Sequence, residues 1–90
     1  MRKCVVTVLG KDRVGIIAQV CTYLAENKIN ILDINQTIVQ DYFNMMMIVD
    51  VSGTEKNFGA LGREMEELGK EMGLDIRIQR EEIFEKMHRL

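Results

Sequence analysis

Apolar and polar residues follow one another along this chain with two different periods, which divide it into six elements and a tail. Apolar residues that alternate with polar ones, or that run on without interruption, indicate strands, and apolar residues three and four positions apart indicate helices. The predicted strands are residues 3–9, 29–39, 43–51 and 74–79. The predicted helices are residues 14–27 and 57–72, and residues 80–90 predict a short C-terminal helix.

The elements follow one another in the order β-α-β-β-α-β, which is that of the split βαβ or ferredoxin-like sandwich. We therefore expect an α+β fold in which a four-stranded antiparallel sheet carries both helices on one face, because right-handed crossovers place them there. We expect residues 1–79 to form one domain and residues 80–90 to form a helical extension. Met46 and Ile48 fall on the open face, where they need cover from the extension or from a partner chain.

The helix predicted at residues 14–27 has a wider apolar surface than one packing contact requires. Two rows of apolar residues follow the helical spacing. One row is Ile17, Cys21 and Leu24, and the other is Ile16, Val20 and Tyr23. We therefore expect a second packing partner for this helix. A second copy of so short a chain would bury apolar surface that one copy leaves exposed.

A charged turn bounded by Gly10 and Gly15 joins the first strand to the first helix. The N–H groups at the start of a helix have no partner within the helix. Together with the positive end of the helix dipole, they form a seat for a small anion or a carboxylate. The N–H groups of residues 14–17 are in this position. Gly15 has no Cβ, so a ligand or a neighbouring backbone can approach it closely.

Length and charge narrow the class of protein further. The 90 residues are 47% hydrophobic and 29% charged, which is typical of one globular domain. The net charge of −2 gives no general attraction to nucleic acid or to an anionic membrane. The apolar run after Arg2 and Lys3 is too short for a secretory signal or a membrane span, so we expect a cytoplasmic protein. Cys4 and Cys21 form no Cys-x-x-Cys motif, and we interpret them as small buried side chains.

No residue pattern indicates a metal site, a cofactor or a catalytic centre. His88 is the only histidine, which excludes a histidine-based metal cluster. The three methionines at residues 45–47 cannot converge on a metal, because strand alternation sends Met46 to the opposite face. RNA binding through the sheet would require exposed aromatic side chains on the central strands, and only Tyr42 and Phe43 occur there.

Two segments of the chain, one after the first predicted strand and one at the end of the first predicted helix, resemble the ACT domain family. The first reads G-x-D-R-x-G-I-I-A at residues 10–18, and the second reads L-A-E-N-x-I-N-I at residues 24–31. The resemblance covers about residues 3–79. The tail is similar to the extension of small bacterial proteins that consist of one ACT domain. The chain is also similar to the ACT domains of the glycine cleavage system transcriptional repressor.

The resemblance implies a regulatory module, not an enzyme, that binds a small ligand at a homodimer interface; amino acids are the common ligands. ACT domains often pair through the second strand and the first helix, which places the ligand between the turn of one subunit and the second strand of its neighbour. The residues expected at the site are Asp12, Arg13, Val14, Gly15, Ile16, Asn30 and Ile31. Asp12 would accept from an α-ammonium group, Asn30 would donate and accept, and the N–H groups after Arg13 would bind a carboxylate.

Each of these residues also has a structural interpretation. Gly15 would permit a tight turn, and Asp12 would cap the helix. Asn30 would hold the start of the second strand through its side chain, and Arg13 would either hold a carboxylate or be a solvated surface residue.

Two other functions remain open. One is a structural domain or protein-interaction module without a small ligand. The other is a hydrolase of the acylphosphatase type, which holds a phosphate at the loop after its first strand. Arg13 and Asn44 are the candidates for the arginine and asparagine of that enzyme. The sequence expected at its helix start is absent, because Gly15-Ile16-Ile17-Ala18 stands there.

Overall fold

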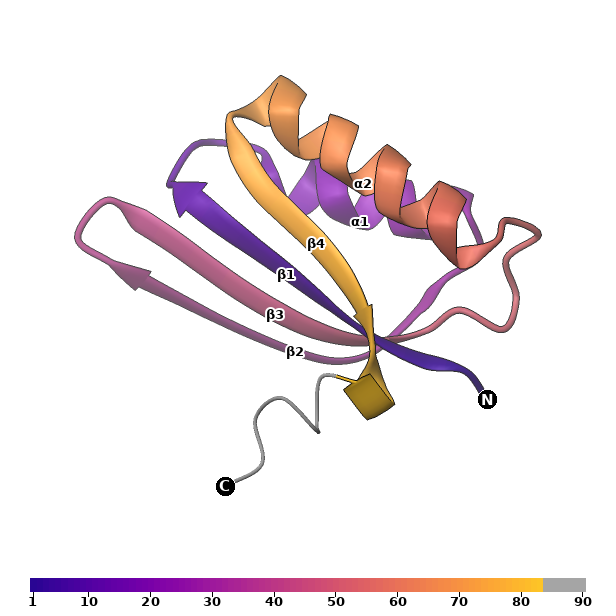
Figure 1. The fold of residues 1–90 in the computed structure, drawn as a ribbon. Coiled ribbons are helices and arrows are strands. Elements are labelled where there is room, and N and C mark those ends of the chain that lie inside the picture. Colours follow the sequence, from indigo (N-terminus) through magenta and orange to yellow (C-terminus); the bar gives the residue numbers. More distant parts are fainter. Residues whose placement is uncertain (84–90) are drawn as a thin grey trace.

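Six elements follow one another along the chain in the predicted order (Figure 1). They belong to a computed structural model that describes residues 1–83. The strands are β1 (Lys3–Lys11), β2 (Asn30–Val39), β3 (Tyr42–Asp50) and β4 (Leu74–Arg80), and the helices are α1 (Ile16–Glu26) and α2 (Phe58–Met72). Residues 81–83 are also helical, and the remainder of the predicted C-terminal helix, residues 84–90, lies outside the described residues.

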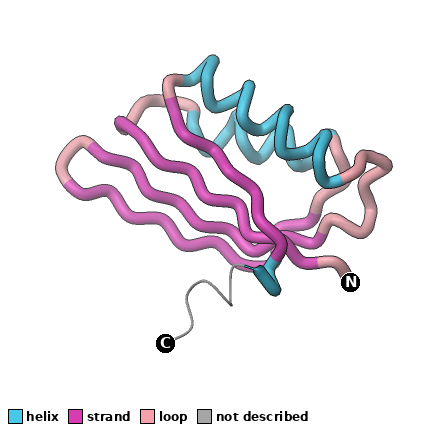
Figure 2. The backbone as a smooth tube through the Cα atoms, in the orientation of Figure 1, coloured by secondary structure: helices cyan, strands magenta, loops and turns pink. Residues whose placement is uncertain are grey.

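The four strands form one antiparallel sheet in the order β2-β3-β1-β4. Both α1 and α2 lie on the same face of this sheet, and the tube in Figure 2 shows the two layers. The α+β, ferredoxin-like fold expected from the order of the elements is therefore confirmed. No helix within residues 1–83 is long and apolar enough to cross a bilayer.

The hydrophobic core lies between the sheet and the two helices. The register of β1 and β3 places three pairs of buried side chains opposite each other, and these pairs are Cys4–Val49, Val6–Met47 and Val8–Met45. The helices add the buried side chains of Ile16, Val20, Leu24, Leu61, Met65 and Met72. The alternation predicted for β3 is confirmed, because its buried and exposed positions alternate along most of the strand.

The first strand and the first helix have different limits from the predicted ones. β1 continues through Gly10 to Lys11, because Gly10 still pairs with β3 and β4. α1 begins at Ile16, because Gly15 has a left-handed backbone (φ 91°) that cannot continue a helix. The buried row of α1 is also different from either predicted row, since Leu24 is buried together with Ile16 and Val20 while Ile17 remains 39% exposed.

The second helix has well-defined ends and lies very close to the sheet. The side chain of Asn57 accepts a hydrogen bond from the N–H of Ala60 at 2.8 Å, which caps the N-terminus of α2 as predicted. At the other end, Gly73 closes the helix with a left-handed backbone (φ 71°). A Cβ at Gly69 would be only 2.7 Å from the carbonyl oxygen of Leu74, so this glycine is required for the close approach of α2 to β4.

A polar network joins the two helices across their outer surface. The hydroxyl of Tyr23 donates to Glu64 at 2.9 Å, and the ammonium of Lys56 donates to the same carboxylate oxygen at 2.6 Å. The hydrogen bonds from Lys56 and Tyr23 hold the pKa of Glu64 below its ordinary value. Burial, together with the bond to Glu64, raises the pKa of Tyr23. Both shifts favour the ionised carboxylate and the neutral phenol, which is the state that holds α1 and α2 together.

The sheet face opposite the helices is partly apolar. Leu9 and Met46 are exposed on this face, and Ile48 is half-buried. Val5 lies in the same row as Ile48 and is buried, although it is outside the core between sheet and helices. We expected Met46 to need cover from the extension or from a partner chain, and no part of residues 1–83 covers it fully, because it is 40% exposed.

Candidate functional site

Two hydrogen bonds to distant parts of the chain hold the first half of the turn between β1 and α1. The backbone N–H of Asp12 donates to the carbonyl oxygen of Asp41 at 2.7 Å, which holds the turn beside the loop between β2 and β3. The guanidinium of Arg13 donates from Nη1 to the carbonyl oxygen of Met72 at 3.3 Å, at the end of α2. These two bonds hold the turn in place without using a side chain of residues 14 or 15.

Gly15 is the N-cap residue of α1, so the interpretation of Asp12 as the cap is wrong. No side chain of the described residues caps this end of the helix, and its first turn contains no acidic residue. The carbonyl oxygen of Gly15 accepts from Gln19 at 3.0 Å, which is the first bond of the helix. The N–H groups of residues 16–18 therefore point out of the helix end, where they and the helix dipole favour an anion.

The space around Gly15 is open. A Cβ built at this position would meet no atom of residues 1–83 within 4 Å, although its left-handed backbone would be strained in any residue with a side chain. The neighbouring Val14 is 95% exposed, so an apolar side chain stands beside the open helix end. The turn therefore combines main-chain donors with apolar contact surface.

Arg13 has a role that neither of its two predicted interpretations included. Its guanidinium binds a carbonyl group at the C-terminus of α2, where the partial negative charge of the helix end favours a cation. Arg13 thus joins the turn to α2. This bond uses one N–H group of the guanidinium, so it is compatible with the predicted role of Arg13 toward a ligand carboxylate.

Asn30 and Ile31 lie at the other end of the protomer from Gly15. They begin β2, where Asn30 pairs with Asp50 and Ile31 pairs with Val49. The 11-residue helix α1 separates them from the turn, which corresponds to a length of about 16 Å. One protomer therefore does not bring the two halves of the predicted site together.

An exposed apolar surface runs along the edge of the sheet between these two ends. Ile34 and Ile38 pair with the buried residues Met47 and Phe43, so they face the helix side of the sheet, yet they are 44% and 50% exposed. Ile17 of α1 is exposed on the same side. We call these three isoleucines the β2 edge surface. Because β2 is one of the two outer strands of the described sheet, its outward backbone groups can also pair with another strand.

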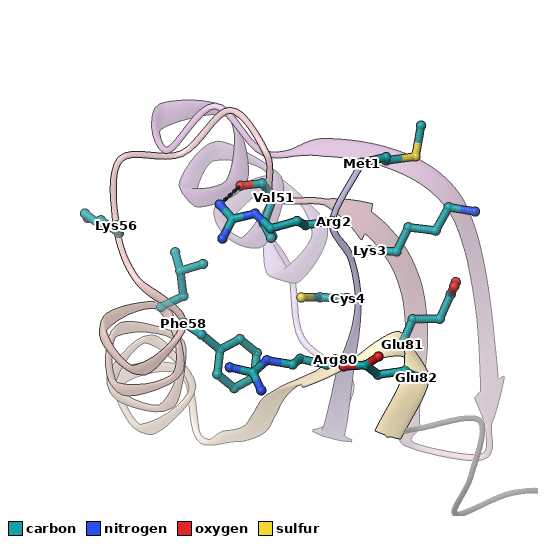
Figure 3. Close-up of a pocket in the computed structure, with 11 residues that line it drawn as sticks. Met1, Arg2, Lys3, Cys4, Val51, Lys56, Phe58, Arg80, Glu81 and Glu82 are labelled. Carbon is teal, nitrogen blue, oxygen red and sulfur yellow. Dashed lines mark hydrogen bonds between the residues drawn. The ribbon is translucent and has the colours of Figure 1, made fainter.

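A cavity of about 610 Å³ lies at the opposite end of the sheet from Gly15, and none of the predicted site residues lines it (Figure 3). It lies between the start of β1, the end of β4 and the start of α2. Sequence reasoning missed it because Arg2, Phe58 and Arg80 are far apart in the chain. The pairing of Cys4 with Arg80 places Arg2 and Arg80 at the same end of the sheet, and the guanidinium of Arg80 lies over the ring of Phe58.

The arrangement required by an acylphosphatase is absent from the described residues. Asn44 lies on the sheet face opposite the helices, whereas Arg13 reaches the end of α2 on the helix face. Within residues 1–83, no three histidine, cysteine, aspartate or glutamate side chains lie close enough to hold a metal ion.

Known proteins with similar sequences and structures agree with this fold. A family model described as ACT domain matches residues 2–79. A UPF0237 protein of Bifidobacterium longum is 58% identical over 90 residues, which is 100% of both chains. The structure of an ACT domain protein from Streptococcus pneumoniae superposes with a TM-score of 0.82 at 42% identity and covers 93% of this chain and 94% of its own. A structure assigned to a glycine cleavage system transcriptional repressor has a TM-score of 0.76 at 24% identity, with 88% of this chain and 45% of that one covered, and is similar in fold.

Proposed function

Because this chain belongs to the ACT domain family, we propose that it is a non-catalytic regulatory module that binds an amino acid between two copies of itself. We assign residues 1–79 to the ACT domain and residues 80–90 to an extension, and we place the protein in the cytoplasm. The observation that carries the proposal is the open end of α1 at Gly15, where no side chain of residues 1–83 caps the helix and a Cβ added at Gly15 would meet no described atom within 4 Å.

A second copy would complete the site through the β2 edge surface. In a two-fold pair with antiparallel β2 strands, the start of one β2 lies beside the end of the other. The end of β2 is close to the turn, because Asp12 is bonded to Asp41 in the adjoining loop. Asn30 of one protomer would therefore lie beside the Gly15 turn of its partner. This pairing would also bury Ile34 and Ile38.

In this arrangement, each group has a distinct role toward an amino acid. The N–H groups of Ile16 and its neighbours bind the α-carboxylate. The carboxylate of Asp12 accepts from the α-ammonium group, and the side-chain amide of the partner's Asn30 donates to or accepts from the same groups. Val14 contacts the apolar part of the ligand side chain. Arg13 positions the turn through its bond to Met72.

The regulatory output would be a change in the association of the two copies. A ligand that contacts both protomers binds the pair more tightly than the single chain, so it favours the pair by the same factor by which pairing raises ligand affinity. We propose that another protein responds to the paired state. We expect neither nucleic acid nor a membrane as that partner.

Isothermal titration with each of the common amino acids, together with sedimentation velocity, tests the proposal. We expect at least one amino acid to bind and to raise the proportion of dimer. Ile34→Lys should weaken both pairing and binding, because it places a charge on the β2 edge surface. Asn30→Ala should weaken binding by about tenfold through loss of one hydrogen bond to a charged group while the dimer remains. Thr37→Lys, on the other face of β2, is the matched control for Ile34→Lys.

The results that would contradict the proposal are also specific. A dimer that binds none of the amino acids would favour a protein-interaction module without a small ligand. A stable monomer that binds an amino acid at full affinity would remove the role of the partner's Asn30. Hydrolysis of an acyl phosphate that disappears in Arg13→Ala would show an enzyme.

A further inference from the structure

The cavity at the start of β1 is large enough for a small organic molecule. Its volume of about 610 Å³ lies within the range of roughly 300–1,000 Å³ that is usual for ligand pockets. It is formed by three segments of a single protomer, and Figure 3 shows their side chains around the thiol of Cys4. None of these residues belongs to the Gly15 turn or to the β2 edge surface.

The inner wall of the cavity is apolar. Cys4 is 2% exposed and Leu61 is 1% exposed, so both belong to the core and present only a small part of their surface to the cavity. Val51 is also buried, and the ring of Phe58 packs against the core at the first turn of α2. An apolar group of a ligand would therefore meet carbon and sulfur atoms on this side.

Two guanidinium groups stand beside this wall. Arg80 places its Cζ atom 5.0 Å from the centre of the Phe58 ring, which holds the guanidinium over the aromatic face. Arg2 donates from Nη2 to the carbonyl oxygen of Val51 at 3.2 Å, which fixes its orientation and leaves other N–H groups of its fork for a ligand. In Figure 3 both side chains extend to the same side of β1 as the Cys4 thiol, with Arg2 and Arg80 on either side of it.

The electrostatic environment of the Cys4 thiol is consistent with this arrangement. Burial raises the pKa of the thiol, while the positive charges of Arg2 and Arg80 act in the opposite direction. Both guanidinium groups are thus close enough for their charge to be felt at the inner wall. The N-terminus of α2, which begins at Phe58, adds the positive end of a helix dipole.

The charges around the cavity limit the number of negative charges that a ligand can carry. Its lining contains the cationic side chains of Arg2, Lys3, Lys56 and Arg80 and the carboxylates of Glu81 and Glu82. Lys56 is already paired with Glu64 at 2.6 Å. Glu81 and Glu82 line the side of the cavity that is away from Phe58, where their carboxylates would repel a polyanion (Figure 3). The remaining cationic side chains, with the N-terminal ammonium of Met1, outnumber the two carboxylates, while the glutamates favour a ligand of low negative charge.

We propose that this cavity is a second binding site, for a small monocarboxylate with an apolar body. The carboxylate binds between Arg2 and Arg80, where charge-assisted hydrogen bonds from guanidinium groups are strong. The apolar body packs on Phe58, Leu61 and Cys4. The site differs from the proposed amino-acid site in its position, in its use of side-chain donors, and in requiring one protomer only.

A titration of the ¹⁵N-labelled full chain with phenylacetate, followed by NMR, tests this site. We expect saturable shifts of the amide signals of Cys4, Val51 and Phe58, with no shifts at the Gly15 turn. 2-Phenylethanol lacks the charge and acetate lacks the apolar body, so each should bind at least about tenfold more weakly. Arg80→Gln and Arg2→Gln should each weaken phenylacetate binding by about tenfold or more.

Arg77→Gln is the matched control, because it removes the same charge from the same strand outside the cavity, where Arg77 is paired with Asp75. It should leave phenylacetate affinity unchanged. The unchanged amide spectrum of each variant away from the cavity shows that it is folded. The proposal is overturned if tens of millimolar phenylacetate cause no saturable shifts at the cavity. It is also overturned if 2-phenylethanol binds equally well, or if Arg77→Gln weakens binding as much as Arg80→Gln does.

Discussion

Two glycines of α2 should respond in opposite ways to the same substitution, because they face different surroundings. Replacing glycine by alanine inside a helix stabilises it by about 1 kcal/mol when there is room for the methyl group. At Gly62 there is room, since the nearest atom to an added Cβ would be Ile78 Cγ2 at 3.9 Å. Gly62→Ala should therefore raise the free energy of unfolding by about 1 kcal/mol.

At Gly69 the same methyl group meets the backbone of β4. The added Cβ would be 2.7 Å from the carbonyl oxygen of Leu74 and 3.2 Å from the backbone nitrogen of Ile76. Neither atom can move without separating α2 from β4, and forced overpacking of this kind costs about 1–3 kcal/mol. The higher helix propensity of alanine offsets about 1 kcal/mol of this cost. Gly69→Ala should therefore lower the free energy of unfolding by up to about 2 kcal/mol.

Urea denaturation at one fixed protein concentration, followed by circular dichroism, measures both variants. The midpoint should rise for Gly62→Ala and fall for Gly69→Ala, with equal slopes in urea. Equal increases for the two variants would refute the reasoning, because they would mean that helix propensity alone decides and that the contact of α2 with β4 is loose.

Two further predictions concern ionisable groups. The pKa of Glu64 is held down by Lys56 and Tyr23, so the carboxylate stabilises the fold above its ordinary pKa of 4.5, and this contribution is lost as the pH falls through the lowered value. The urea midpoint should thus decrease in this acid range, and Glu64→Gln should show a smaller decrease; an identical profile would contradict the network. Cys4 is 2% exposed and Cys21 is half-buried, so a thiol reagent should modify Cys21 faster than Cys4, which mass spectrometry of the labelled peptides would show; equal rates would contradict the burial of Cys4.

The fold could be predicted from the sequence because local patterns and tertiary packing agree. β3 alternates between buried and exposed positions as its sequence alternates, and Asn57 and Gly73 mark the ends of α2 as their chemistry predicts. The limits of β1 and α1 were less accurate. Gly10 suggested a break, but it pairs on both sides within the sheet, and the break falls at Gly15 instead.

The candidate sites were predictable to different degrees. The turn at Gly15 is continuous in sequence, so its open helix end could be inferred from the glycine and the apolar residues that follow it. The bond from Arg13 to Met72 joins residues 59 positions apart, and no local pattern indicates it. The cavity likewise depends on β1 and β4 being neighbours in a particular register, which pairs Cys4 with Arg80.

The two proposed sites differ in how they depend on protein concentration, and this difference separates them without any substitution. Asn30 and Gly15 of one protomer lie at opposite ends of α1, so the amino-acid site exists only where two copies meet. The cavity takes Arg2, Phe58 and Arg80 from one chain. On dilution below the dissociation constant of the dimer, amino-acid affinity should therefore fall, while phenylacetate affinity stays constant. If both affinities fell together, the cavity would need the second copy as well; if neither fell, the amino acid would bind a single protomer and the β2 edge surface would have no part in its site.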